Sequence, residues 1–289
     1  MEPRLAADEL RRHIVRTKRL PTIPIVLSKI LDLIEDVNSS VFDLEEVISH
    51  DQSIAAKVLG LANSAFYGFG RKIDTISQAI IVIGFNAVKS LAIGVSIFDK
   101  FYNTVQGTLL DLNGLWMHSV ATAEGTRLIS ERLRRGNLEA SFICGLLHDL
   151  GKVAFISILP NDYQEAVAES LRLNRRLYEV EQEAFGVAHD TLGSWVAERW
   201  HLPSDLVRCL HEHHNPSYAG QDAELVHTVG VADYLSKKLG LGSSIDPVLQ
   251  PLASNSLRVI GLTVDQLAGI EAALLEQRGR IEQFFAILK

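Results

Sequence analysis

The chain of 289 residues contains only two cysteines, Cys144 and Cys209, and both lie within apolar runs. So few cysteines argue against the disulfide framework that stabilises small secreted domains. We therefore expect each cysteine to be a small core residue and the protein to be cytoplasmic.

The sequence also lacks a long hydrophobic run and an export signal. No uninterrupted apolar stretch reaches the ~18–20 residues of a membrane helix. The longest candidate, residues 79–98, contains Asn86 and Lys89. The first residues show no central apolar block followed by a cleavage site of small residues. A net charge of −7 argues against a nucleic acid or an anionic membrane as partner. We expect no membrane span.

Alternating strand-like patterns are scarce, whereas leucine, isoleucine and valine recur at three- and four-residue spacing through most of the chain. Because 47% of the residues are hydrophobic, the chain can bury a large core. The predicted fold class is therefore all-α. Expected helices include residues 7–17, 25–36, 44–49 with Asp43 as the cap, 115–133, 139–159, 163–173, 177–184, 189–200, 203–213, 223–238, 246–252 and 264–287.

The dipeptide His-Asp occurs three times, at His50-Asp51, His148-Asp149 and His189-Asp190. The first lies between two short helices, where an aspartate accepts backbone N–H bonds, so we interpret it as a helix cap. The second is surrounded by apolar residues, and a buried carboxylate without a partner is costly. Its aspartate therefore needs either an ion pair with Lys152 or a metal ion.

Other histidines and one other acid stand in similarly apolar helical segments: His118, His189, His213, His214 and Asp233. Imidazole nitrogens and carboxylate oxygens bind iron, manganese or zinc, and helical bundles build such sites from one or two ligands per helix. A cation among these side chains would satisfy both buried acids. The alternatives are one structural metal or a hydrogen-bonded polar cluster. Asp190 is interpreted as an acid in the first turn of its helix, so the third pair contributes only its histidine.

A glycine-rich loop at residues 63–71 holds Phe66, Tyr67 and Phe69. These aromatic side chains either contact a partner or a nucleotide, or attach the loop to the second half of the chain.

Several motifs follow one another in a defined order. They are LPTIP at residues 20–24, NSAFYG at 63–68, ISQAIIVIGF at 76–85, GLLHDLGK at 145–152, EAFGVAHDTLG at 183–193, and WHLP at 200–203 before HHNP at 213–216. Their order resembles the HDOD domain, an HD-related output domain of bacterial signalling proteins. Within the wider HD superfamily of metal-dependent phosphohydrolases, His118, His148-Asp149 with Lys152, and Asp233 are similar to the family's H…HD…D signature.

The resemblance implies a multi-helix HD-like bundle fused to an N-terminal helical subdomain. We expect the subdomains to cover residues 1–104 and 105–289, the second including the C-terminal helices. It also implies one or two ions of iron, manganese or zinc. One ion would take His118, His148, Asp149 and Asp233. Because His189, His213 and His214 are similar to the extra ligands of the HD-GYP branch, they would serve a second ion, with Asp149 bridging.

Two functions are compatible with this resemblance. In the regulatory function, which we favour because HDOD domains are regarded chiefly as regulatory, the protein binds a metal and relays a signal. It would do so through a signalling protein in trans or a small phosphate-bearing nucleotide. In the alternative, a binuclear site hydrolyses a phosphate ester or diester, with Asp149 and Lys152 as catalytic residues.

Two departures from the HD-GYP pattern bear on the enzymatic alternative. Residues 215–218 (NPSY) stand where those enzymes carry a glycine-tyrosine-proline loop, which argues against hydrolysis of a cyclic dinucleotide. Gly114 stands one turn before His118, where some of those enzymes place a further glutamate ligand. This glycine disfavours a third metal.

Overall fold

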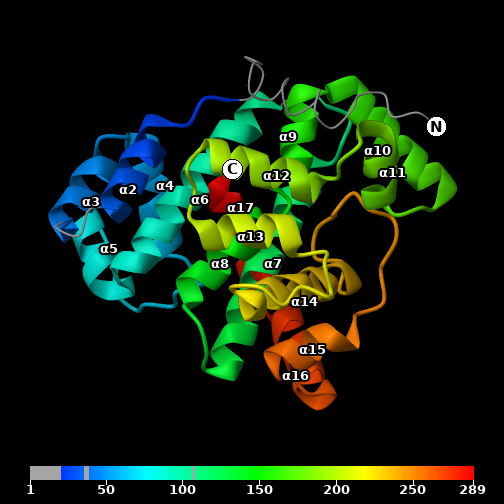
Figure 1. Cartoon of the computed structure of the whole chain (residues 1–289). Helices are drawn as coiled ribbons and strands as arrows, with labels where there is room; N and C mark the ends of the chain where they lie inside the picture. Colours follow the sequence, from blue (N-terminus) through cyan, green and yellow to red (C-terminus); the bar gives the residue numbers. More distant parts are fainter. Residues whose placement is uncertain (1–20, 36–38, 106–107) are drawn as a thin grey trace.

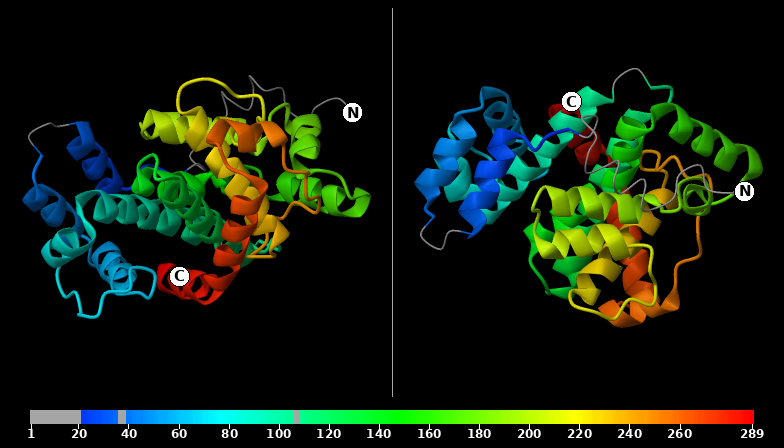
Figure 2. Two further views of the ribbon diagram at one scale, coloured as in Figure 1. Left: turned by 90° about the horizontal axis from the view of Figure 1, so that it is seen from below. Right: turned by 45° about the horizontal axis from the view of Figure 1, so that its top comes forward.

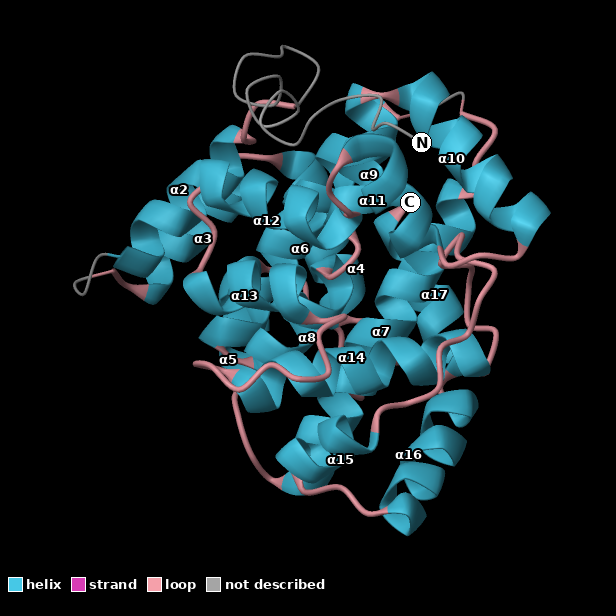
Figure 3. Cartoon of the chain, turned by 45° about the vertical axis from the view of Figure 1, so that its right-hand side comes forward, coloured by secondary structure: helices cyan, strands magenta, loops and turns pink. Residues whose placement is uncertain are grey.

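The computed structural model describes residues 21–35, 39–105 and 108–289. Every regular element in these residues is a helix (Figures 1 and 3), which confirms the all-α expectation. The expected helix at residues 7–17 lies outside the described residues. The helices are α2 (Ile25–Glu35), α3 (Val41–Ser49), α4 (Gln52–Ala62), α5 (Ile76–Ile83), α6 (Phe85–Thr104), α7 (Leu112–Leu133), α8 (Leu138–Leu147), α9 (Leu150–Ile158), α10 (Pro160–Leu173), α11 (Leu177–Phe185), α12 (His189–Arg199), α13 (Ser204–Glu212), α14 (Ala223–Lys238), α15 (Ser254–Ile260), α16 (Val264–Glu276) and α17 (Arg278–Leu288).

Helix α7 forms the centre of the molecule and packs against α8, α14, α16 and α17. Small residues permit this close packing. A Cβ atom on Gly125 of α7 would lie 3.2 Å from the Cβ of Ala232 on α14. A Cβ on Gly145 of α8 would lie 2.7 Å from the Cα of Ala123 on α7. Polar side chains on these three helices are therefore brought together in the interior.

The N-terminal helices α2 to α5 pack on the long helix α6, at the blue and cyan end of the molecule in Figure 1. The C-terminal helix α17 contacts α4 and α6 as well as α7, and Figure 2 shows its red ribbon beside the cyan helices. The C-terminal helix thus packs on the N-terminal half of the described chain. The proposed division between residues 104 and 105 stays a prediction.

Phe66 attaches the loop that follows α4 to the second half of the chain. Its ring centroid lies 5.4 Å from that of Phe142 on α8 and 5.2 Å from that of Phe284 on α17. The guanidinium of Arg127 on α7 lies 5.3 Å from the same ring. This packing favours the second interpretation of the aromatic loop for Phe66, whereas Phe69 remains 47% exposed.

The helix expected at residues 44–49 begins earlier than predicted. Ser40, not Asp43, is its N-cap: the Ser40 hydroxyl accepts the Asp43 backbone N–H at 3.3 Å, and the Asp43 carboxylate accepts the Ser40 N–H at 2.7 Å. This reciprocal pair is a capping box. Asp43 is therefore the third residue of the helix, which starts at Val41.

Two expectations near the C-terminus are wrong. Residues 246–252 form no helix, because Pro251 lacks the N–H that would bond the Pro247 carbonyl four residues earlier, and its ring would clash with that carbonyl. The helix expected at 264–287 is divided at Gln277 into α16 and α17. The division lets α16 bury Ile270 against α7 while α17 turns toward α4 and α6.

The stretch that is long and apolar enough to cross a membrane by length and composition alone is Leu138–Ile158, which contains α8 and α9, not residues 79–98 as expected. However, 94% of its most apolar window is buried against the rest of the chain, as in the core helix of a globular protein. This burial agrees with the expected lack of a membrane span. The cytoplasmic location stays a prediction.

Candidate metal centre

The central His-Asp pair lies at a break between two helices, not within one helix as predicted for residues 139–159. Helix α8 ends at Leu147 and α9 begins at Leu150. Asp149 leaves helical geometry, with φ −93° and ψ 15°, while the His148 ring pairs through Nδ1 with the Gly145 carbonyl oxygen at 2.8 Å. Adjacent side chains on an uninterrupted helix diverge by ~100°. The break lets both side chains face one interior space.

A first group of buried ligand atoms comes from α7, the break and α14. It consists of His118, His148 and Asp233, whose candidate ligand atoms all lie within 4.8 Å of one another. The His118 Nε2 is 2.9 Å from Asp233 Oδ1, and the His148 Nε2 is 3.6 Å from the same oxygen. One cation could therefore contact a side chain from each of three elements.

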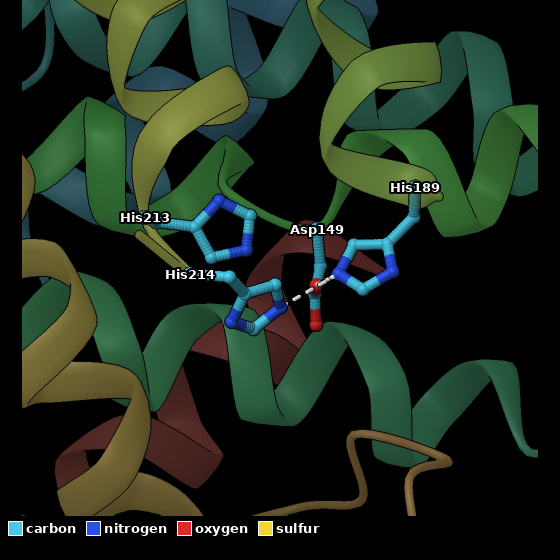
Figure 4. Close-up of side chains that lie close together, drawn as sticks. All are labelled: Asp149, His189, His213 and His214. Carbon is cyan, nitrogen blue, oxygen red and sulfur yellow. Dashed lines mark hydrogen bonds and ion pairs between the residues drawn. The ribbon is translucent and has the colours of Figure 1, made fainter. Parts of the chain in front are cut away.

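A second group consists of Asp149, His189, His213 and His214, whose candidate ligand atoms also lie within 4.8 Å of one another. Figure 4 shows the imidazole rings of this group gathered around the Asp149 carboxylate. The His189 Nε2 lies 3.4 Å from Asp149 Oδ1 and 2.9 Å from the His214 Nε2. His189 begins α12, and the two adjacent histidines follow the end of α13.

Asp149 connects the two groups through its separate carboxylate oxygens. Oδ1 faces His189 in the second group, whereas Oδ2 lies 3.3 Å from the His148 Nε2 and 3.8 Å from the His118 Nε2. This is the placement expected of a carboxylate that bridges two ions. The structure thus brings all seven predicted ligands together. Their role as ligands stays a prediction.

Bonds on the outer side of three rings direct their Nε2 atoms inward. The His148 Nδ1 pairs with the Gly145 carbonyl, the His213 Nδ1 pairs with the Leu210 carbonyl at 2.9 Å, and the His189 Nδ1 donates to Glu181 at 2.6 Å. Histidines that bind metals are commonly oriented by such a bond at the other ring nitrogen.

Several inward atoms are buried with no hydrogen-bond partner in suitable geometry, although the His118 Nε2 lies 2.9 Å from Asp233 Oδ1. They are Nε2 of His118, His148 and His213, and Oδ1 of Asp149 and Asp233. Buried polar atoms normally have a partner, so this many in one place is unusual. All are electron-pair donors of the kinds that bind iron, manganese or zinc. The residues present therefore fit a metal ion.

Two lysines contact the Oδ2 atoms of the buried acids. The Lys152 Nζ donates to Asp149 Oδ2 at 2.8 Å and to the Ser244 carbonyl at 3.1 Å. The Lys237 Nζ lies 3.2 Å from Asp233 Oδ2. The predicted Asp149–Lys152 ion pair is therefore present. It uses Oδ2, which also faces the first group, and leaves Oδ1 to the second group.

The mixture of charges shifts several pKa values strongly. Burial alone raises the pKa of Asp149 and Asp233, but nearby His148, Lys152 and Lys237 hold both well below the usual range. Burial lowers the pKa of His148, and the two carboxylates outweigh it and raise the pKa to about 9. Burial and the neighbouring rings lower the pKa of His213 to about 3. Both acids are thus ionised, His213 is a neutral imidazole, and His148 holds a proton that a bound cation would displace from Nε2.

The cluster opens into a cavity of about 200 Å³. Its wall includes His213, His214 and Asp233 and two cationic side chains, Arg176 and Lys237. The non-helical segment at residues 246–253 forms part of the same wall. The cavity wall thus carries two cationic side chains as well as the Asp233 and Asp246 carboxylates.

The sequence interpretation missed Lys237, Arg176 and Glu181. Lys237 stands four residues after Asp233 and so shares its helix face, which is a usable signal. Glu181 stands four residues after buried Leu177 on α11, which also places it on the buried face. Nothing in the local pattern distinguishes Arg176, because its place in the cavity depends on how α11 packs.

The remaining predictions about single residues agree with the structure. Asp51 accepts the N–H groups of Ser53 and Ile54 and caps α4, beside an exposed His50. Asp190 lies in the first turn of α12. A Cβ on Gly114, in the first turn of α7, would lie 2.1 Å from Asp111 Oδ2 and 2.8 Å from the Ser243 Cβ, so a side chain there would require these neighbours to shift.

Comparison with known proteins identifies relatives of this arrangement. A family model described as the HDOD domain matches residues 20–216. An uncharacterised protein of Treponema pallidum (strain Nichols) is 28% identical over 220 residues, which are 74% of this chain and 42% of that protein. The chain thus spans less than half the length of this relative.

Solved structures share the fold. An HDOD domain protein of unknown function from Geobacter sulfurreducens is similar with a TM-score of 0.81 and 25% identity, covering 95% of this chain and 96% of that one. A protein of Shewanella amazonensis SB2B, provisionally described as a phosphohydrolase, has a TM-score of 0.76 and 21% identity, with 96% and 97% covered. A provisionally described signal transduction protein of Marinobacter aquaeolei VT8 has a TM-score of 0.78 and 20% identity, with 97% and 65% covered.

Proposed function

Since this chain belongs to the HDOD domain family, we propose that it is a signal-transduction protein whose buried histidine-aspartate cluster binds one or two divalent cations. One observation carries the proposal. Three imidazole nitrogens and two carboxylate oxygens are buried without hydrogen-bond partners and face one interior space. A cation there would provide the partner that each of these atoms lacks.

The residues of each group have distinct tasks in this proposal. His118, His148 and Asp233 hold one ion, and His189, His213 and His214 hold the other, with Asp149 shared. A bound ion of this kind supplies Lewis acidity toward phosphate oxygens and water. Lys152 donates to Asp149 Oδ2, the oxygen that faces the first group, and keeps the carboxylate oriented toward both groups.

The regulatory output follows from where the ligands stand. They lie at the ends of α8, α9, α12 and α13 and within α7 and α14, so a change in metal occupancy alters the forces among six helices. A change of this kind shifts a conformational equilibrium only if the two states bind the cation with different affinity. The protein would then present a different surface to a signalling protein in trans or to a phosphate-bearing nucleotide.

One observation favours the alternative of phosphate-ester hydrolysis. Arg176 and Lys237 line the cavity that opens onto the cluster, and positive charge beside a metal site suits a phosphate group. Asp149 and Lys152 would then be the catalytic residues. We rank this function second, because the chain lacks the glycine-tyrosine-proline loop of the HD-GYP enzymes.

Metal analysis of the purified chain, followed by a phosphodiesterase and nucleotidase screen, distinguishes the two functions. The test variant is Asp149→Ala, and the matched control is Asp51→Ala in the structural His-Asp pair. Bound metal without turnover supports the regulatory function. Turnover that disappears in Asp149→Ala and persists in Asp51→Ala supports hydrolysis. A wild-type chain that binds no iron, manganese or zinc refutes both.

A further inference from the structure

Glu181 on α11 is completely buried and bonded on both carboxylate oxygens. Oε1 accepts the Tyr163 hydroxyl at 2.7 Å. Oε2 accepts the His189 backbone N–H at 2.9 Å and the His189 Nδ1–H at 2.6 Å. Three donors therefore converge on one carboxylate, and two of them belong to the same histidine.

These bonds fix His189 in both backbone and ring. Helix α12 has no side-chain cap from its own N-cap residue, Ala188, so Glu181 supplies an acceptor to the first N–H of that helix. Gly186 adopts a left-handed conformation, φ 74°, which turns the chain after α11 and returns His189 beside Glu181. The carboxylate and the imidazole are thus held together by the backbone as well as by their own bond.

The bond to Nδ1 determines which ring nitrogen faces the cluster. When a neutral imidazole carries its proton on Nδ1, the lone pair is on Nε2. In this structure that Nε2 points toward Asp149 Oδ1 and the His214 Nε2. Tyr178 meets the His189 and His214 rings edge-on, at 6.1 and 5.4 Å between centroids, and restricts both rings sideways.

We propose that Glu181 is a positioning residue for the second metal group, holding His189 as the Nδ1–H form with its Nε2 lone pair directed at the ion. The proposal rests on the proposed function. Tyr163 on α10 is the outer member of the same chain of bonds, so the α10–α11 hairpin at the edge of the molecule in Figure 1 supports the centre from outside.

The test uses Glu181→Gln in the full chain, with Glu124→Gln as the matched control. Glu124 is also a buried glutamate, 1% exposed, but both of its carboxylate oxygens accept from Arg127, and it belongs to neither group of candidate ligands. Tyr163→Phe removes only the outer hydrogen bond and keeps the test open should Glu181→Gln fail to fold.

Two readouts separate positioning from simple loss of stability. In metal-free protein, long-range proton–nitrogen NMR spectra report which nitrogen of His189 is protonated. We expect Nδ1–H in the wild type and a mixture of forms in Glu181→Gln. In Co²⁺ titrations followed by visible absorption, the second equivalent should bind about 10–100-fold more weakly in Glu181→Gln, the range found for orienting residues of metal ligands. Tyr163→Phe should show a smaller change in the same direction.

Unchanged His189 protonation and unchanged Co²⁺ affinity in both variants would overturn the proposal. So would an equal loss of affinity in Glu124→Gln, because that result indicates a general effect of removing a buried charge. A wild-type chain that takes up no Co²⁺ refutes the proposed function itself. The spectrum of metal-free His189 still decides in that case whether Glu181 fixes the ring.

Discussion

The Lys152 ammonium lies 2.8 Å from Asp149 Oδ2, and both side chains are at most 2% exposed. Asp149 stands at the break between α8 and α9, and Lys152 lies three residues later in the first turn of α9. Together with His148, Lys152 supplies the positive charge that stabilises the buried Asp149 carboxylate without a metal. Because a carboxylate oxygen has two lone pairs, Oδ2 can accept Lys152 and still face the first group, so the pair and a metal ion are compatible.

Replacing Lys152 by methionine tests this relationship. The variant keeps a long apolar side chain but leaves Asp149 without its ammonium partner, and breaking a buried pair from one side costs about 3–5 kcal/mol. We expect this loss in urea unfolding with a chelator present, and a partial recovery when Mn²⁺ is added. An identical loss with and without Mn²⁺ would show that no cation reaches Asp149.

Metal addition should stabilise the wild-type chain by mass action. A ligand that binds only the folded state contributes about 2.7 kcal/mol to the free energy of unfolding at about 100 times its Kd. His118→Gln should lose a large part of this gain, because His118 supplies a nitrogen to the first group. His50→Gln is the matched control, since His50 is exposed and belongs to the structural His-Asp pair. Equal stabilisation of both variants contradicts the assignment of His118.

The cluster could be predicted from sequence because each of its members is a polar residue within an apolar helical segment, and a buried acid such as Asp233 needs a partner. The break at His148-Asp149 could not be predicted from the sequence, because the apolar pattern continues from α8 into α9. The interruption depends on packing against α7. The role of Glu181 was hidden for a related reason. Its partner His189 begins the next helix, beyond the turn at Gly186, so no pattern within one helix links the two residues.

Gly151 should be essential for the contact between α9 and α12. A Cβ at this position would lie 1.8 Å from the His189 carbonyl oxygen and 2.8 Å from the Gly193 nitrogen, so backbone would have to move. We expect Gly151→Ala to lower the free energy of unfolding by about 1–3 kcal/mol or more and to weaken metal binding through His189. Urea unfolding and Co²⁺ titration measure the two effects.

Gly269 provides the control for this substitution. It is an exposed position within α16 where an added Cβ would have no neighbouring atom within 4 Å, so alanine there should stabilise the helix by about 0.5–1 kcal/mol. We therefore expect Gly151→Ala to lower the free energy of unfolding and Gly269→Ala to raise it. A neutral Gly151→Ala variant would mean that the spacing between α9 and α12 is adjustable.

Glu124 lies outside the histidine-aspartate cluster, and its protonation should make the free energy of unfolding depend on pH. Its carboxylate accepts two bonds from Arg127, at 2.9 and 2.8 Å. Burial nevertheless outweighs Arg127 and raises the pKa of Glu124 above its ordinary value of 4.5. A carboxyl group with a raised pKa in the folded state binds its proton more tightly there than in the unfolded chain.

The contribution of Glu124 protonation to stability is therefore fully present below about pH 4.5, the unfolded value, and is lost as the pH rises through the raised pKa of the folded state. Glu124→Gln cannot titrate, so the stability of the wild type relative to this variant should fall as the pH is raised from 4.5. Urea unfolding of both proteins across this range measures the difference. A difference that stays constant, or that grows with pH, would show that Arg127 compensates fully for burial and that the ionised carboxylate is the favoured form in the folded chain.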